Sequence, residues 1–222
     1  MQGSRMHKGK GLFISFEGGD GAGKSTQLKK IREYMEERGL ETVFTREPGG
    51  TPIGEKIRNV ILDVDNREMT DYTESYLYAA SRAQVVREVI RPALMEGKVV
   101  VCDRFVDSSI AYQGYGRGLG RETVWNINKD AVGDCMPDLT IFLDIDPGKA
   151  DRRMGSRTER RDRLEVAGVD FHQKVYDGYM EMIASQEGDN PRIVAVPADL
   201  PPDEVWENIK TLLDKKLETV EL

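Results

Sequence analysis

Five short apolar runs alternate with longer segments of helical periodicity, and this alternation limits the possible folds of the chain more than any other feature. Two of the runs are apolar at every position and two more are interrupted by a single Ser or Thr, which is typical of strands covered on both faces. The runs occupy residues 12–16, 42–45, 99–102, 139–143 and 193–196. We therefore predict an α/β fold, a five-stranded parallel sheet with helices on both faces.

The segments between the runs carry helix signals. Residues 25–38 place Leu28, Ile31 and Met35 on one face, and Gly39 follows as a C-terminal stop. Further helices are expected at residues 71–91, at 169–186 and around Val205–Leu213. In such folds ligands bind beyond the carboxyl ends of the strands.

Composition excludes several classes of protein. The 222 residues suit one domain, and the net charge of −7 argues against a general nucleic-acid binder. No apolar run approaches the ~18 residues that a membrane span needs. Residues 1–10 are basic without an apolar core, so we expect a flexible leader followed by one domain over residues 11–222. The two cysteines form no motif, and we expect a cytoplasmic protein that binds neither nucleic acid nor a membrane.

A glycine-rich loop follows the first apolar run. Gly18-x4-Gly23-Lys24-Ser25 is a complete phosphate-binding pattern, placed between a predicted strand and a predicted helix as it requires. Its backbone N–H groups can surround phosphate oxygens, Lys24 can reach the β- and γ-phosphates, and Ser25 can bind Mg²⁺. The candidate ATP-binding residues are Gly18, Gly19, Asp20, Gly21, Ala22, Gly23, Lys24, Ser25 and Thr26.

Two arginines at strand ends indicate a second phosphate site. Arg104 lies in "DRF" after the third run, and Arg46 lies in "TREPGGT" after the second. Both are expected at the same edge of the sheet as the glycine-rich loop. "NKD" at residues 128–130 lacks the spacing of a guanine-reading motif and is expected to be helical.

The chain as a whole resembles the thymidylate kinases. The resemblance rests on "FEGGDGAGKST", "TREPGGT", "YAASRAQ", "DRFVDSSIAYQG", "RRMGSRTERRDRLE" and "VPADLPPDEV", in that order from Gly11 to the final helix. It implies a P-loop nucleoside monophosphate kinase-like fold. The implied reaction transfers the γ-phosphoryl group of ATP to dTMP, giving dTDP for DNA precursor synthesis. A homodimer is typical of the family.

The resemblance also assigns an acceptor site. Arg46 and Arg104 match positions that hold the 5′-phosphate of dTMP, and Asp20 matches one that contacts its 3′-hydroxyl. In the family an aromatic, usually phenylalanine but here Tyr78, stacks on thymine, while Arg82 donates to O4 of the base. The implied dTMP-binding residues are Asp20, Arg46, Arg58, Tyr78, Arg82, Arg104, Ser109, Tyr112 and Gln113.

A basic stretch matches the family's mobile lid, here about residues 148–165. Since Gly21 stands where some relatives carry a catalytic arginine, the lid is expected to supply it, from Arg153 or Arg157. Ser25 and, through water, Asp103 are expected to hold Mg²⁺. The candidate catalytic residues are Lys24, Asp103, Arg104, Arg153 and Arg157.

Two alternatives remain open at this stage. One is another nucleoside monophosphate kinase of the UMP/CMP type, which a panel of acceptors would identify. The other is a nucleotide-binding switch without transfer activity, which would bind ATP or GTP without acceptor-dependent turnover.

Overall fold

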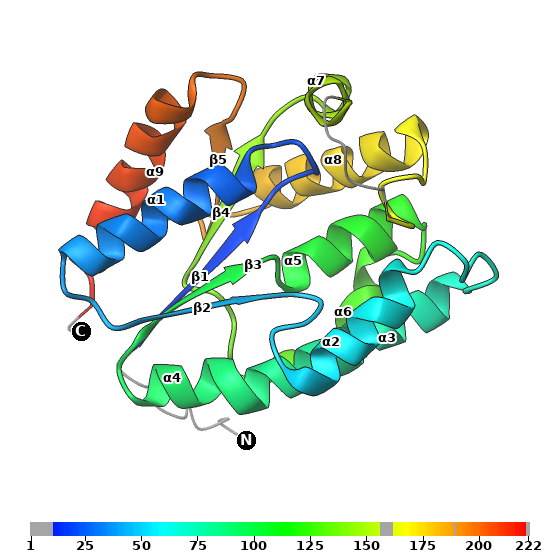
Figure 1. The fold of residues 1–222 in the computed structure, drawn as a ribbon, viewed down its shortest axis with the longest axis horizontal. Coiled ribbons are helices and arrows are strands. Elements are labelled where there is room, and N and C mark those ends of the chain that lie inside the picture. Colours follow the sequence, from blue (N-terminus) through cyan, green and yellow to red (C-terminus); the bar gives the residue numbers. More distant parts are fainter. Residues whose placement is uncertain (1–10, 156–161, 189, 221–222) are drawn as a thin grey trace.

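A computed structural model describes residues 11–155, 162–188 and 190–220; the expected leader at residues 1–10 lies outside them. Five parallel strands form one sheet in the order β2-β3-β1-β4-β5 (Figure 1). The strands are β1 (Leu12–Glu17), β2 (Thr42–Arg46), β3 (Val99–Asp103), β4 (Leu139–Asp144) and β5 (Ile193–Pro197). All five predicted strands are confirmed, and so is the α/β class.

Alternate residues of each strand face two different cores. On β1, Leu12, Ile14 and Phe16 belong to a cluster shared with α1 (Lys24–Glu37) and α9 (Pro202–Leu217). Phe13 belongs to a cluster on the opposite face of the sheet. Each face of β1 is thus fully buried, which explains why the run is apolar almost throughout.

Most of the remaining helices cover the second face of the sheet. The helix expected at residues 71–91 is longer and changes geometry along its length: α3 (Asp71–Val85), a π-helical turn η1 (Val86–Ile90) and α4 (Arg91–Met95). The other elements are α5 (Val106–Ser109), η2 (Ile110–Gly116), α6 (Arg121–Val132), α7 (Pro147–Met154) and α8 (Val169–Ala184). The "NKD" residues lie on α6, as expected.

The sequence-based prediction missed several helices, namely α5, η2, α7 and one between β2 and α3. α2 (Pro52–Leu62) packs against α3. Its start carries recognisable signals, because the Thr51 hydroxyl accepts from the Gly54 N–H and Pro52 occupies the first turn. Gly49 and Gly50, just before this start, are more typical of a turn than of a helix.

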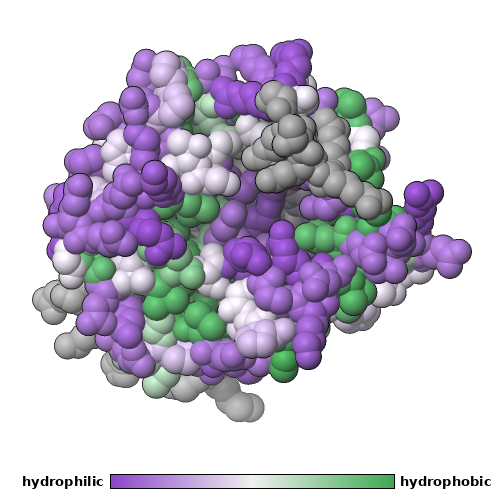
Figure 2. Space-filling model, in the orientation of Figure 1, coloured by the Kyte–Doolittle hydropathy of each residue, from purple (hydrophilic) through white to green (hydrophobic). Residues whose placement is uncertain are grey.

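Hydrophilic residues predominate on the face of the molecule seen in Figure 2. Among the described helices, none combines the length and apolar character that crossing a bilayer demands. The carboxyl ends of β1, β2 and β3 meet at one edge of the sheet (Figure 1), and their loops bring the candidate residues together there.

Candidate active site

The glycine-rich loop connects β1 to α1 and packs against α7. Gly21 has φ +82°, and a Cβ at this position would lie 2.3 Å from the carbonyl oxygen of Ala150. Glycine is therefore required for this arrangement of loop and helix. The Lys24 ammonium is buried and donates to the carbonyl oxygens of Gly18 (2.9 Å) and Gly19 (3.1 Å). Lys24 thus lies at the mouth of the loop, where phosphate oxygens would compete for its donors.

A polar cavity of about 160 Å³, here called the phosphate cavity, lies in front of this loop. Its lining includes most of the groups predicted to contact phosphates, from four segments of the chain: Asp20, Gly21, Gly23, Lys24, Ser25, Arg46, Arg58, Asp103 and Arg104. Arg46 is half-exposed and pairs with Glu55 at 2.8 Å, while Arg58 donates to the carbonyl of Pro48. The cavity therefore combines a helix N-terminus, a lysine and three arginines, which suits several phosphate groups.

Asp20 links the loop to Arg104. Its carboxylate accepts from the Arg104 guanidinium at 2.8 Å and lies 3.8 Å from the Lys24 ammonium. Burial alone would raise the pKa of Asp20, but Arg104 and Lys24 outweigh it and lower the pKa to about 2. Asp20 is therefore ionised at neutral pH, fit to accept hydrogen bonds from a ligand.

The depressed pKa of Asp20 predicts a pH-dependent stability. Because the pKa falls from 3.8 to about 2 on folding, the stabilisation is fully present above the unfolded pKa and disappears as pH falls toward 2. Unfolding with urea should show wild type about 2 kcal/mol more stable than Asp20→Asn at neutral pH. The difference should shrink steadily below about pH 4; a difference that stays constant would contradict the assignment.

A second pocket, the inner pocket, adjoins the phosphate cavity and has a volume of about 80 Å³. Eight of the nine residues expected to contact dTMP line it: Asp20, Arg58, Tyr78, Arg82, Arg104, Ser109, Tyr112 and Gln113. The ninth, Arg46, lines the phosphate cavity instead. Asp20, Arg58 and Arg104 line both, so the two sites are continuous.

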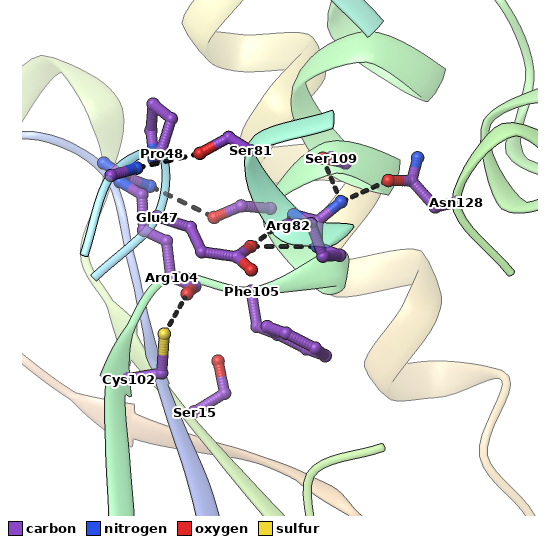
Figure 3. Close-up of polar contacts among 12 residues, drawn as sticks. Ser15, Glu47, Pro48, Ser81, Arg82, Cys102, Arg104, Phe105, Ser109 and Asn128 are labelled. Carbon is purple, nitrogen blue, oxygen red and sulfur yellow. Dashed lines mark hydrogen bonds and ion pairs between the residues drawn. The ribbon is translucent and has the colours of Figure 1, made fainter. Parts of the chain in front are cut away.

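Arg82 lies at the base of the inner pocket in a buried network. Its Nε and Nη2 both donate to one oxygen of Glu47, at 2.9 and 2.6 Å. Its Nη1 donates to Ser109 at 3.1 Å and to Asn128 (Figure 3). Of the five N–H groups of a guanidinium, one on Nη2 remains for a ligand. The sequence analysis predicted Arg82 as a contact of the base, but it did not predict these hydrogen bonds.

Glu17, at the end of β1, is a further group that the sequence analysis missed. It is fully buried, and its Oε1 accepts from the Ser15 hydroxyl and the Phe105 N–H, both at 2.7 Å. Oε2 accepts from Ser108 at 2.5 Å and Tyr179 at 2.8 Å. Burial raises the pKa of Glu17. Glu17 therefore anchors the backbone immediately after Arg104 to the central strand.

The described part of the expected lid contacts both sides of the site. On α7, Arg153 donates to the carbonyl of Ala198, after β5, at 2.9 Å. Arg163 instead donates to Glu74 on α3 at 2.6 Å and to the carbonyl of Ile61 at 2.8 Å, beside the inner pocket. Arg157 falls among residues 156–161, outside the described part of the chain.

The residues expected to hold Mg²⁺ lie together in the phosphate cavity. Ser25 is exposed, and the Asp103 Oδ1 is buried without a hydrogen-bond partner in the described structure. An orphaned carboxylate oxygen beside a phosphate site fits a hydrated cation. Within the described residues no cluster of three or more His, Cys, Asp or Glu could hold a metal alone, so phosphate and water would complete the coordination.

Comparisons with known proteins give a consistent result. A family model described as thymidylate kinase matches residues 16–209. The thymidylate kinase of Finegoldia magna is 53% identical over 176 residues, covering 79% of this chain and 86% of that protein. That of Clostridium novyi is 47% identical over 205 residues, or 92% of this chain and 98% of that protein. A crystal structure of thymidylate kinase from Ehrlichia chaffeensis, 33% identical, matches 91% of this chain and 98% of its own with a TM-score of 0.71.

Proposed function

The chain belongs to the thymidylate kinase family, and on that premise we propose that it transfers the γ-phosphoryl group of ATP to dTMP, giving dTDP and ADP. The observation that carries the proposal is the continuity of the two sites, joined by Asp20, Arg58 and Arg104. A donor triphosphate on the glycine-rich loop and an acceptor monophosphate in the inner pocket would place their phosphates in one cavity.

The acceptor binds with its phosphate toward Arg46, Arg58 and Arg104 and its base toward Arg82 and Tyr78. Arginine suits the phosphate because its donors form a fixed fork. A guanidinium N–H on Arg82 can donate to thymine O4 but not to the amino group of cytosine. Asp20 accepts from the 3′-hydroxyl, and Ser109, Tyr112 and Gln113 line the base and sugar.

Catalysis needs little proton transfer, because the attacking atom is an oxygen of the acceptor's own ionised phosphate. Lys24 and Arg104 hold the reacting phosphates in line and neutralise the charge that builds up on them. Arg153 and Arg157 are the proposed lid arginines, and the lid excludes water that would otherwise hydrolyse ATP. Ser25 and, through water, Asp103 would hold Mg²⁺, which would supply positive charge against the phosphates of ATP.

Asp103→Asn is predicted to weaken the binding of Mg²⁺ without disturbing the binding of the acceptor. Because the amide keeps the shape but loses the charge, half-maximal activity should need about 10–100 times more Mg²⁺. The KM for dTMP should stay close to that of wild type. Titrating Mg²⁺ at saturating ATP and dTMP measures the first, and varying dTMP at saturating Mg²⁺ measures the second. An unchanged Mg²⁺ requirement would exclude Asp103 from the metal site.

The activity is tested by ADP release with Mg·ATP and one acceptor at a time: dTMP, dUMP, UMP, CMP, AMP and GMP. We expect strong release with dTMP, weak release with dUMP, and little with the others. One methyl group is worth only about 1–3 kcal/mol in a binding site, so dUMP should be a poor substrate rather than a rejected one. If another monophosphate gave the strongest release, the proposed phosphate sites would remain supported. The proposed roles of Arg82 and Tyr78 in recognising the base would be wrong.

We also propose that the protein is a cytoplasmic homodimer that binds neither nucleic acid nor a membrane. Its chain would divide into a leader at residues 1–10 and one kinase domain over residues 11–222. Large apolar side chains are exposed on α2 (Ile53 and Val60) and on α3 (Tyr72 and Tyr76). Each pair lies on one face of its helix, and the two helices pack together, so they offer a surface that a second copy would cover. Sedimentation equilibrium should give twice the mass of the chain.

A further inference from the structure

The two ends of the Gln113 side-chain amide have unequal surroundings. Gln113 lines the inner pocket and is 1% exposed. Its Nε2 donates to the Oε1 of Glu74 at 2.9 Å, whereas its Oε1 is buried without a hydrogen-bond partner in the described structure. Buried acceptors without partners are uncommon, and one that belongs to a ligand pocket points to a donor on the ligand.

The charge of Glu74 decides which way the amide faces. Glu74 is 1% exposed and also accepts from Arg117 at 3.1 Å and Arg163 at 2.6 Å. Burial would raise the pKa of Glu74, but Arg117, Gln113 and Arg163 together lower it. An ionised carboxylate can only accept hydrogen bonds, so the NH₂ group of Gln113 must face Glu74. The carbonyl oxygen is left for the opposite side.

We propose that Glu74 is a positioning residue that sets base selectivity by holding Gln113 with its carbonyl oxygen toward the acceptor base. Glu74 lies outside the residues that line the inner pocket, so it acts through Gln113. Gln113 then presents an acceptor and Arg82 a donor. Thymine and uracil carry the matching N3–H and O4, whereas cytosine has the opposite pattern at both positions. The inference rests on the proposed function, in which the inner pocket binds the base of dTMP.

The test is Glu74→Gln, with dUMP and dCMP as competitive inhibitors of dTMP phosphorylation. These two nucleotides differ only at the N3 and C4 edge of the base. A glutamine at position 74 can donate to the carbonyl of Gln113, which frees the Gln113 amide to turn its NH₂ toward the base. The ratio of the dCMP to the dUMP inhibition constant should fall about tenfold from its wild-type value, with the KM for ATP unchanged.

Arg117→Met is the matched control. It removes another partner of Glu74 but leaves the bond between Glu74 and Gln113, so the inhibition ratio should stay at the wild-type value. An unchanged ratio in Glu74→Gln, or an equal fall in both variants, would overturn the proposal.

If Glu74→Gln does not fold, Gln113→Met removes the same acceptor while Glu74 keeps its arginines. A wild-type ratio in that variant would also overturn the proposal. Failure of the wild-type protein to phosphorylate dTMP would instead contradict the proposed function.

Discussion

Replacing Arg82 with alanine is expected to lower the free energy of unfolding by about 3–5 kcal/mol, apart from any effect on catalysis. Arg82 is 1% exposed and Glu47 is 2% exposed, and the guanidinium donates twice to that carboxylate. Burial raises the pKa of Glu47 to about 7 even beside Arg82, so without Arg82 this group would either take up a proton or stay buried without a counter-charge. Urea denaturation of the two proteins measures the difference.

The same substitution should weaken use of dTMP far more than binding of ATP, because Arg82 lines the inner pocket and not the phosphate cavity. The double variant Arg82→Met/Glu47→Gln separates the two effects. Removing both charges should restore most of the lost stability, since no uncompensated charge remains. The KM of the double variant for dTMP should remain above that of wild type, because the guanidinium is still missing. If a stable variant loses dTMP use and ATP binding equally, Arg82 does not recognise the base.

Local signals explain what could be predicted from the sequence. The strands were predicted because each carries a short apolar run, and the phosphate loop because its glycines, lysine and serine lie close together in the chain. Asp103 and Arg104 could be placed near that loop because parallel strands end at one edge. These inferences need only short stretches of sequence and one rule of topology.

The buried acidic residues could not be predicted, because their partners are distant in the chain. Glu17 accepts from a backbone N–H 88 residues away, Glu47 from an arginine 35 residues away, and Glu74 from an arginine 89 residues away. A lone glutamate gives no sign in sequence of whether it faces solvent or a buried arginine. Glu17 offered one signal, an acidic residue that ends a buried strand directly before a glycine-rich loop.

Arg104→Ala is predicted to lower kcat/KM for dTMP by about 10²–10³-fold. Arg104 lines both pockets and donates to Asp20 at 2.8 Å and to Ser108 at 3.4 Å. Arg104 would contact the acceptor's phosphate before and during transfer. The KM for dTMP should therefore rise, and kcat should fall. Steady-state kinetics at varied dTMP measure both. Binding of ATP, followed by a fluorescent analogue, should change less than use of dTMP, although Arg104 also lines the phosphate cavity.

The backbone at Arg104 allows a sharp control. Its φ is +69°, the only positive value at a non-glycine residue in the described chain. Such a conformation costs an L-residue about 1–2 kcal/mol, and it is held here by the Glu17 bond to the next N–H, that of Phe105.

Arg104→Gly should therefore lose as much activity as Arg104→Ala while being about 1 kcal/mol more stable. Equal stability of the two variants would show that the positive φ carries no strain. Higher activity in the glycine variant would show that the guanidinium is not the group that matters. The shape that Glu17 imposes on this turn would then be the feature on which transfer depends.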